Sequence, residues 1–212
     1  DGQHFYERAG FDEAALERYR TMFGGFGQAV STMPDSYQRL QDGDIVNIGG
    51  REWRAIATSG HCPEHISLYC DEDALLISGD QILPTISSNV SVWPTEPNAN
   101  PLQAWLDACH RLQTEIRPDT LVLPSHGKPF LGAHERLRAL IDEHETGLAK
   151  LRTLCREPQR VVDTFGALFK GRISEGNLIM ATGEAIAHLN YLVARAEMTI
   201  EQRDNVSWYQ TR

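Results

Sequence analysis

The chain contains no uninterrupted apolar run long enough to cross a membrane, and no signal-peptide pattern opens it. Basic residues are also few, since 20 Lys and Arg stand against 29 Asp and Glu and the formal net charge is −9. A protein that follows a phosphate backbone normally clusters Lys and Arg on its surface. The sequence therefore predicts no membrane span and disfavours a nucleic acid as the partner, which leaves a small-molecule substrate.

Cysteine is scarce as well, with four residues at positions 62, 70, 109 and 155 and no C-x-x-C pair. This spacing gives neither a dense disulfide framework nor a redox motif. A reducing compartment is the simpler environment for such a chain, and we predict a cytoplasmic location. Cys62 stands beside His61, so it is either a metal ligand, a reactive thiol or a small residue that fills a turn.

What is present is the composition of a globular protein, with 212 residues of which 41% are hydrophobic and 23% charged. Residues 1–36 read as helical, with Asp12 as an N-cap. Their aromatic side chains could pack in a core or line a substrate entrance: Phe5, Tyr6, Phe11, Tyr19, Phe23 and Phe26. From Ser36 the pattern alternates with a period of two, which predicts strands over 37–40, 44–48, 52–58, 66–70 and 75–80.

The second half of this region favours helices around one more strand. Asn100 and Pro101 predict the start of a helix that ends near residue 116. An apolar run predicts a strand over 120–123, and a long apolar stripe predicts a helix over 133–156. His144 stands between Glu143 and Glu145 and is predicted to lie on the helix surface.

Three of the predicted strands deliver a metal-capable side chain where they end or turn. His61 follows the strand that ends at Thr58, Asp80 ends the strand over 75–80, and His126 follows the strand over 120–123. Each residue alone is more often structural. Together, imidazoles and a carboxylate at the ends of buried strands favour a metal site.

These residues also lie in recognisable motifs. Gly60-His61-Cys62-Pro63-Glu64-His65, Ser78-Gly79-Asp80 and Ser125-His126-Gly127 resemble, in order and spacing, three motifs of the metallo-β-lactamase superfamily, the glyoxalase-like hydrolases. The resemblance covers roughly residues 37–156. It implies an α/β (α+β) fold, the metallo-β-lactamase-like αββα sandwich, of which this chain would supply the C-terminal half.

The resemblance also implies roles for the residues. Asp80 would bridge two metal ions, His61 would bind the first and His126 the second, while His65 would orient a ligand or the substrate. Zinc is the default metal for such ligands, and manganese or iron would tolerate them. The function implied is a metal-dependent hydrolase, in which hydroxide attacks the carbonyl of a small ester, thioester, lactone or amide.

The family's His-x-His-x-Asp-His cluster is absent, because no two of the eight histidines are two positions apart. We therefore expect a missing N-terminal segment to supply further ligands. The isolated chain would be inactive and would bind metal weakly or not at all. An N-terminal fragment of the same protein, or a homodimer partner, would cover the exposed face of the sheet.

Two segments remain beside the motifs. The irregular stretch over 81–100 leaves the Asp80 strand, so Asn89, Trp93 and Thr95 are candidates for the substrate wall, unless it is a plain surface loop. We place a domain boundary after residue 156. Residues 157–212, with helices over 160–169 and 177–195 and a hairpin around Asp204-Asn205, resemble a winged-helix tail.

That tail contains six basic and seven acidic residues, a poor balance for phosphate binding. It would serve packing or dimerisation. Two other functions stay open: an RNA or phosphodiester hydrolase of the same superfamily, and a non-catalytic remnant used for binding or dimerisation.

Overall fold

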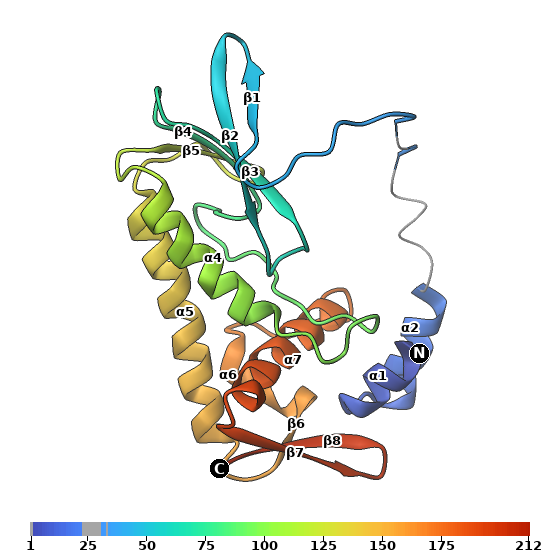
Figure 1. The fold of residues 1–212 in the computed structure, drawn as a ribbon. Coiled ribbons are helices and arrows are strands. Elements are labelled where there is room, and N and C mark those ends of the chain that lie inside the picture. Colours follow the sequence, from blue (N-terminus) through green and yellow to red (C-terminus); the bar gives the residue numbers. More distant parts are fainter. Residues whose placement is uncertain (1, 23–30, 33) are drawn as a thin grey trace. The chain divides into compact units, whose positions relative to one another are not determined.

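The computed structural model describes residues 2–22, 31–32 and 34–212 (Figure 1). The chain forms two compact units. The sheet unit consists of residues 40–91 and 100–149, and the helix–hairpin unit consists of residues 1–39, 92–99 and 150–212. The domain boundary after residue 156 stays a prediction.

A five-stranded sheet forms the centre of the sheet unit (Figure 1). Its spatial order follows the chain: β1 (Ile45–Ile48), β2 (Arg51–Thr58), β3 (His65–Cys70), β4 (Leu75–Gly79) and β5 (Leu121–Pro124). Neighbouring strands are antiparallel, except that β4 and β5 are parallel. The strand predicted over 37–40 is wrong: Tyr37 is 76% exposed, and no strand in the described part of the chain pairs with this segment.

Two helices accompany this sheet, α4 (Pro101–Glu115) and α5 (Ala133–Leu154). The predicted start of α4 is confirmed, because the Asn100 side chain accepts a hydrogen bond from the Gln103 amide and Pro101 opens the helix. The apolar side of α4 is buried, including Leu102, Trp105, Leu106, Cys109 and Leu112. His134 at the start of α5 contacts the Ile116 carbonyl through Nε2 at 3.0 Å, which joins the ends of the two helices.

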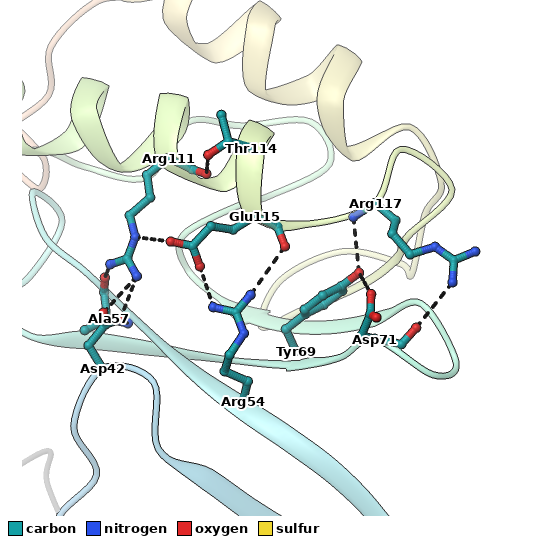
Figure 2. A network of polar contacts seen from close by, with 9 residues as sticks. All are labelled: Asp42, Arg54, Ala57, Tyr69, Asp71, Arg111, Thr114, Glu115 and Arg117. Carbon is teal, nitrogen blue, oxygen red and sulfur yellow. Dashed lines mark hydrogen bonds and ion pairs between the residues drawn. The ribbon is translucent and has the colours of Figure 1, made fainter.

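A network of charged side chains fastens α4 to the sheet (Figure 2). Glu115 on α4 accepts hydrogen bonds from Arg54 on β2 and from Arg111 one helical turn earlier. Arg111 also donates to both carboxylate oxygens of Asp42, at 2.9 and 2.8 Å, and to the Ala57 carbonyl at 2.8 Å. The three nitrogens of the Arg111 guanidinium thus donate to three different groups, Glu115, the Ala57 carbonyl and Asp42, so the network sets how α4 lies against β2.

The other face of the sheet is apolar and partly exposed. Leu68, Ile77 and Leu123 lie next to one another in register across β3, β4 and β5. Each is partly exposed, with Ile77 at 39%, whereas their neighbours Leu76 and Val122, which point to the opposite face, are fully buried. The sheet unit thus has the helices and one sheet of the expected αββα arrangement.

The surface position predicted for His144 is wrong. His144 is 3% exposed, its ring meets that of Trp105 edge-on at 6.4 Å, and its Nε2 lies 3.5 Å from the Ser87 hydroxyl. The reason is the helical period, because position 144 falls on the same stripe of α5 as the buried Leu137, Leu140 and Leu148. The flanking glutamates lie on either side of that stripe.

In the helix–hairpin unit, α1 (Gly2–Arg8) and α2 (Glu13–Met22) form the N-terminal part. The Asp12 cap is confirmed, because its carboxylate accepts a hydrogen bond from the Ala15 amide at 2.8 Å. Tyr6 is 2% exposed, and its ring contacts those of Phe5, Phe11 and Tyr19 at centroid distances of 5.1, 5.0 and 4.7 Å. These aromatic residues therefore form a core, and Phe23 and Phe26 lie outside the described residues.

The rest of this unit comprises α7 (Leu178–Ala194) and a three-stranded sheet in the order β6 (Gln159–Arg160), β8 (Val206–Thr211), β7 (Met198–Arg203). The predicted hairpin is confirmed, and Asp204 and Asn205 both take the left-handed conformation that its tight turn requires. The single helix predicted over 160–169 is wrong. The segment is divided into β6, a 3-10 helix (Val161–Thr164) and α6 (Phe165–Leu168), because pairing of Arg160 with β8 draws the chain into the sheet. The winged-helix interpretation stays a prediction.

No helix in the described part of the chain is both long and apolar enough to span a membrane.

Candidate metal centre

The ends of four strands bring the predicted site residues to one edge of the sheet. His61 lies in the turn between β2 and β3, Asp80 directly follows β4, and His126 follows β5. The pairing of Thr58 with His65, and of Gly79 with Pro124, sets these ends beside one another. Residues 61, 80 and 126 therefore converge although they are far apart in the sequence.

Asp80 stands between the two imidazoles. The Nε2 atom of His61 is 3.5 Å from Oδ2 of Asp80, and the Nε2 atom of His126 is 3.6 Å from Oδ1. The side chains of His61 and Asp80 are about one-third exposed, and that of His126 is 69% exposed. Among the described residues, no three His, Cys, Asp or Glu side chains are gathered closely enough to hold an ion as they stand.

The pairwise spacing nevertheless fits zinc. Two ligands of one tetrahedral Zn²⁺ ion, each about 2.1 Å from it, lie about 3.4 Å from each other. Both His–Asp distances are within a few tenths of an ångström of this value. Because Asp80 presents a different oxygen to each imidazole, it is placed as a carboxylate that two cations could share.

The orientation of His61 is set by the segment after β4. Its Nδ1 atom lies 2.8 Å from the Asn89 backbone carbonyl. A carbonyl accepts only from a protonated nitrogen, so Nδ1 carries a hydrogen, and the ring is turned with Nε2 toward Asp80. A metal-binding histidine commonly donates its other N–H in this way. Asn89 thus lies beside the site, and its contact with substrate stays a prediction.

Two serines that the sequence interpretation missed hold Asp80. The Ser125 hydroxyl donates to Oδ1 of Asp80, and the Ser88 hydroxyl donates to the Asp80 backbone carbonyl. Ser125 belongs to the Ser-His-Gly motif, so its position directly before His126 could have identified it as a site residue. Ser88 lies in the irregular stretch after β4, where no pattern marks it.

His65 lies at the start of β3 and faces the backbone behind Asp80. Its Nδ1 is 3.4 Å from the Thr58 hydroxyl, and its Nε2 lies against Gly79. Burial lowers the pKa of His65, and the neighbouring His61 lowers it further, while Asp80 opposes both. At neutral pH the ring is therefore neutral. Its role in orienting a ligand or the substrate stays a prediction.

Cys62 as a whole residue is exposed, but its thiol is partly buried. This burial, and then the nearby charge of Asp80, raise the pKa of the thiol. The thiol is thus protonated at neutral pH, which suits a turn residue better than a reactive nucleophile. Trp93 and Thr95 belong to the helix–hairpin unit, where the Trp93 side chain is 44% exposed. Their contact with substrate stays a prediction.

Comparison with known proteins assigns both parts of the chain. Residues 3–126 match the model of the metallo-beta-lactamase superfamily, and residues 148–212 match that of the metallo-beta-lactamase-like C-terminal domain. The chain is 40% identical to a beta-lactamase domain protein from Burkholderia ambifaria of known structure, with a TM-score of 0.91 over 98% of this chain and 60% of that one.

Two curated relatives are more distant. The first, a Bacillus subtilis (strain 168) protein named "probable metallo-hydrolase YqjP", is 25% identical over 171 residues, which are 78% of this chain and 53% of that protein. A hydroxyacylglutathione hydrolase from Rhodopseudomonas palustris (strain BisB5) is 35% identical over 54 residues, 26% of this chain and 21% of that enzyme. The chain spans about half the length of the first curated relatives it matches. On the family model and the fold together, the chain belongs to the metallo-beta-lactamase superfamily.

Proposed function

We propose that the protein is a metal-dependent hydrolase whose centre is built on His61, Asp80 and His126. The observation that carries this proposal is the spacing of two imidazole nitrogens about one ligand distance from opposite oxygens of one carboxylate. Zinc is the metal that we propose first, because the imidazole and carboxylate groups of this centre are typical zinc ligands and hydrolysis requires no change in the oxidation state of the metal. Manganese and iron accept the same ligand types.

The residues of the chain have defined tasks in this centre. When bound, a pair of such cations lowers the pKa of a bound water to about 7 and polarises the oxygen of a substrate carbonyl. Asp80 would hold the pair together, with Ser125 fixing the direction of its carboxylate. The Asn89 carbonyl, as acceptor for Nδ1 of His61, would fix the ring orientation that directs Nε2 to the metal.

The substrate class that we propose is a small thioester, ahead of a lactone, ester or amide. Its support is the name of one relative, hydroxyacylglutathione hydrolase, whose 54 matched residues cover a quarter of this chain. The net charge of −9 argues against the alternative of an RNA or phosphodiester hydrolase, because a polyanionic substrate would be repelled.

We further propose that the complete centre needs a segment outside these 212 residues, or a second copy of the chain. Three ligands are too few to hold two ions tightly. In addition, the row formed by Leu68, Ile77 and Leu123 leaves apolar surface exposed on one face of the sheet. A partner that covers this face could bring the remaining ligands to the same edge.

Zinc competition with a chromogenic chelator tests the centre in the 212-residue chain. We expect binding weaker than about 1 µM, because complete structural zinc sites bind with about 10–16 kcal/mol. The substitution Asp80→Asn, which keeps the shape and removes the charge, should abolish it. The matched control is His110→Gln, because His110 lies exposed on α4. Tight binding of two ions would refute the need for further ligands.

The activity itself is tested in the full-length product of the gene, with a small acyl thioester as substrate. Asp80→Asn should lower kcat/KM at least about a hundredfold. Loss of a group that only orients a metal ligand costs about 10-fold to 100-fold in activity, and loss of the ligand itself should cost no less than the upper end of that range. His110→Gln should leave the rate unchanged. If Asp80→Asn is as active as the wild type, the catalytic centre is not built on Asp80. If neither protein hydrolyses the thioester and zinc binding does not depend on Asp80, the protein is a non-catalytic binding or dimerisation module.

A further inference from the structure

The helix–hairpin unit contains a cavity of about 130 Å³ that the proposed hydrolytic function does not use. Its walls come from α1, residues 94–98, the 3-10 helix, α7 and the β7–β8 hairpin, all within this one unit. For comparison, an engineered cavity of about 150 Å³ is large enough to bind benzene. The cavity therefore has room for a ligand of about half a dozen heavy atoms.

The walls of the cavity are fixed by hydrogen bonds. The Ala9 carbonyl after α1 accepts from the Val162 amide at 3.3 Å. On the opposite side, the Asn190 side-chain amide donates to the carbonyls of Pro97 and Ala99 at 3.2 and 2.9 Å, which holds the segment around Pro97 to α7. A preformed cavity costs little ordering when a ligand enters.

Most of the lining is apolar, but one permanent charge faces it. Phe5, Val161, Ile186 and Ile200 supply apolar surface, and no Asp or Glu is among the lining residues. Arg8, at the end of α1, is the cation. Its Nε donates to the Ser207 hydroxyl at 3.4 Å, and within the described residues no carboxylate lies within ion-pair distance of it. The two terminal nitrogens of Arg8 are thus left for an external acceptor.

The hydroxyl of a buried tyrosine supports the same conclusion. Tyr209 on β8 lines the cavity and is only 4% exposed, and its hydroxyl has no hydrogen-bond partner among the described residues. This hydroxyl is not among the unpaired polar atoms that are fully buried, so it is accessible to a molecule in the cavity that Tyr209 lines. Burial raises the pKa of Tyr209 to about 12, with Arg8 acting in the opposite direction, so the hydroxyl keeps its proton and can donate to an anion.

We propose that this cavity is a binding site for a small monocarboxylate with a short apolar chain. The carboxylate would accept hydrogen bonds from the terminal nitrogens of Arg8 and from the Tyr209 hydroxyl, and the chain would lie against Ile186 and Ile200. A guanidinium matches a carboxylate with two parallel hydrogen bonds. A phosphate dianion suits the cavity less, since one fixed cation and apolar walls would leave part of its charge uncompensated.

Binding is tested by nuclear magnetic resonance on protein labelled at the isoleucine methyl groups, with butanoate as the probe. The methyl signals of Ile186 and Ile200 should shift and saturate. Those of Ile56 and Ile82, both fully buried in the sheet unit, should stay in place. Butanamide, which has the same shape without the charge, should bind at least about tenfold more weakly than butanoate. Inorganic phosphate should not produce saturable shifts of these two signals. The experiment needs no metal, so it is independent of the hydrolase proposal.

Variants assign the binding to the named groups. Arg8→Met should weaken butanoate at least about tenfold, Arg8→Lys less than that, and Tyr209→Phe about threefold to tenfold. Arg172→Met is the matched control, because Arg172 is exposed in the same unit and does not line the cavity. If Arg8→Met unfolds the protein, the two milder variants decide. Equal affinity for butanamide, the absence of saturable shifts at Ile186 and Ile200, or unchanged affinity in both milder variants would overturn the proposal.

Discussion

The stability of the protein should depend on pH through one buried histidine. His188 on α7 is 3% exposed, and its Nδ1 lies 2.8 Å from the Glu184 carbonyl one helical turn earlier. Burial lowers the pKa of His188 from its usual 6.5 to about 4, although the hydrogen bond to Glu184 opposes the change. The folded protein therefore holds this imidazole neutral where the unfolded chain would protonate it.

The sign and size of the effect follow from these two pKa values. Between pH 4 and 6.5 the unfolded chain binds more protons than the folded one, so stability is complete above about pH 6.5 and falls as the pH decreases. From pH 7 to pH 5 the loss is about 2 kcal/mol. For a chain of this size, that corresponds to a decrease in Tm of roughly 4–7 °C.

Urea unfolding followed by circular dichroism at pH 5, 6 and 7 measures this loss. Because the chain contains seven other histidines, the informative quantity is the difference between the wild type and His188→Leu, whose stability should change less with pH by about 2 kcal/mol. His110→Leu, at an exposed position on α4, serves as the control and should keep the wild-type dependence. A wild-type pH dependence in His188→Leu would show that His188 does not carry the effect.

Two further substitutions test the packing that supports the metal centre, each by its urea midpoint. Arg111→Met removes the pairs with Asp42 and Glu115 and should lower the free energy of unfolding by about 1–2 kcal/mol. The control is Arg138→Met, which removes an exposed pair with Glu135 and should change that free energy by less than about 0.5 kcal/mol. Equal effects of the two substitutions would contradict the role given to the network. Gly60→Ala places a Cβ atom 2.6 Å from Cβ of Trp105 and should cost more than about 2 kcal/mol, well above Gly43→Ala, which also has a positive φ but open space around it. Similar losses in the two glycine variants would show that backbone strain alone decides.

The sequence was sufficient for those elements whose signals are local. Asp12 and Asn100 cap helices through side chains three residues from the amides they bind, and Asp204-Asn205 encodes its own tight turn. The order of short apolar runs was enough to predict the strands of the sheet unit that end at His61, Asp80 and His126. Their convergence was inferred from the three strand ends and from the family resemblance together, because no local signal shows that residues 61 and 126 meet.

The sequence-based predictions failed where contacts with a segment far away in the sequence determine the local structure. Residues 37–40 alternate like a strand, but none of the strands that the structure describes pairs with them. Arg160, the first residue of the predicted helix, is drawn into a strand because Trp208, almost fifty positions later, offers backbone groups for pairing. Ser88 and the Asn89 carbonyl contact the site from an irregular stretch whose path no periodicity describes.

The glycines of the motifs show how packing and chemistry share the same residues. Gly60, directly before His61, lies against the backbone of α4 at Trp105, where a Cβ atom would approach the Trp105 amide nitrogen to 2.8 Å. Gly79, directly before Asp80, adopts a φ of +52° and leaves the space that the His65 ring fills. Each glycine thus lets a strand end come close enough for the next side chain to reach the site. In both the Gly-His and the Gly-Asp pair, the glycine permits the close backbone approach and the next residue is the proposed metal ligand. These pairs therefore indicate how the chain packs at the site as much as they indicate metal binding.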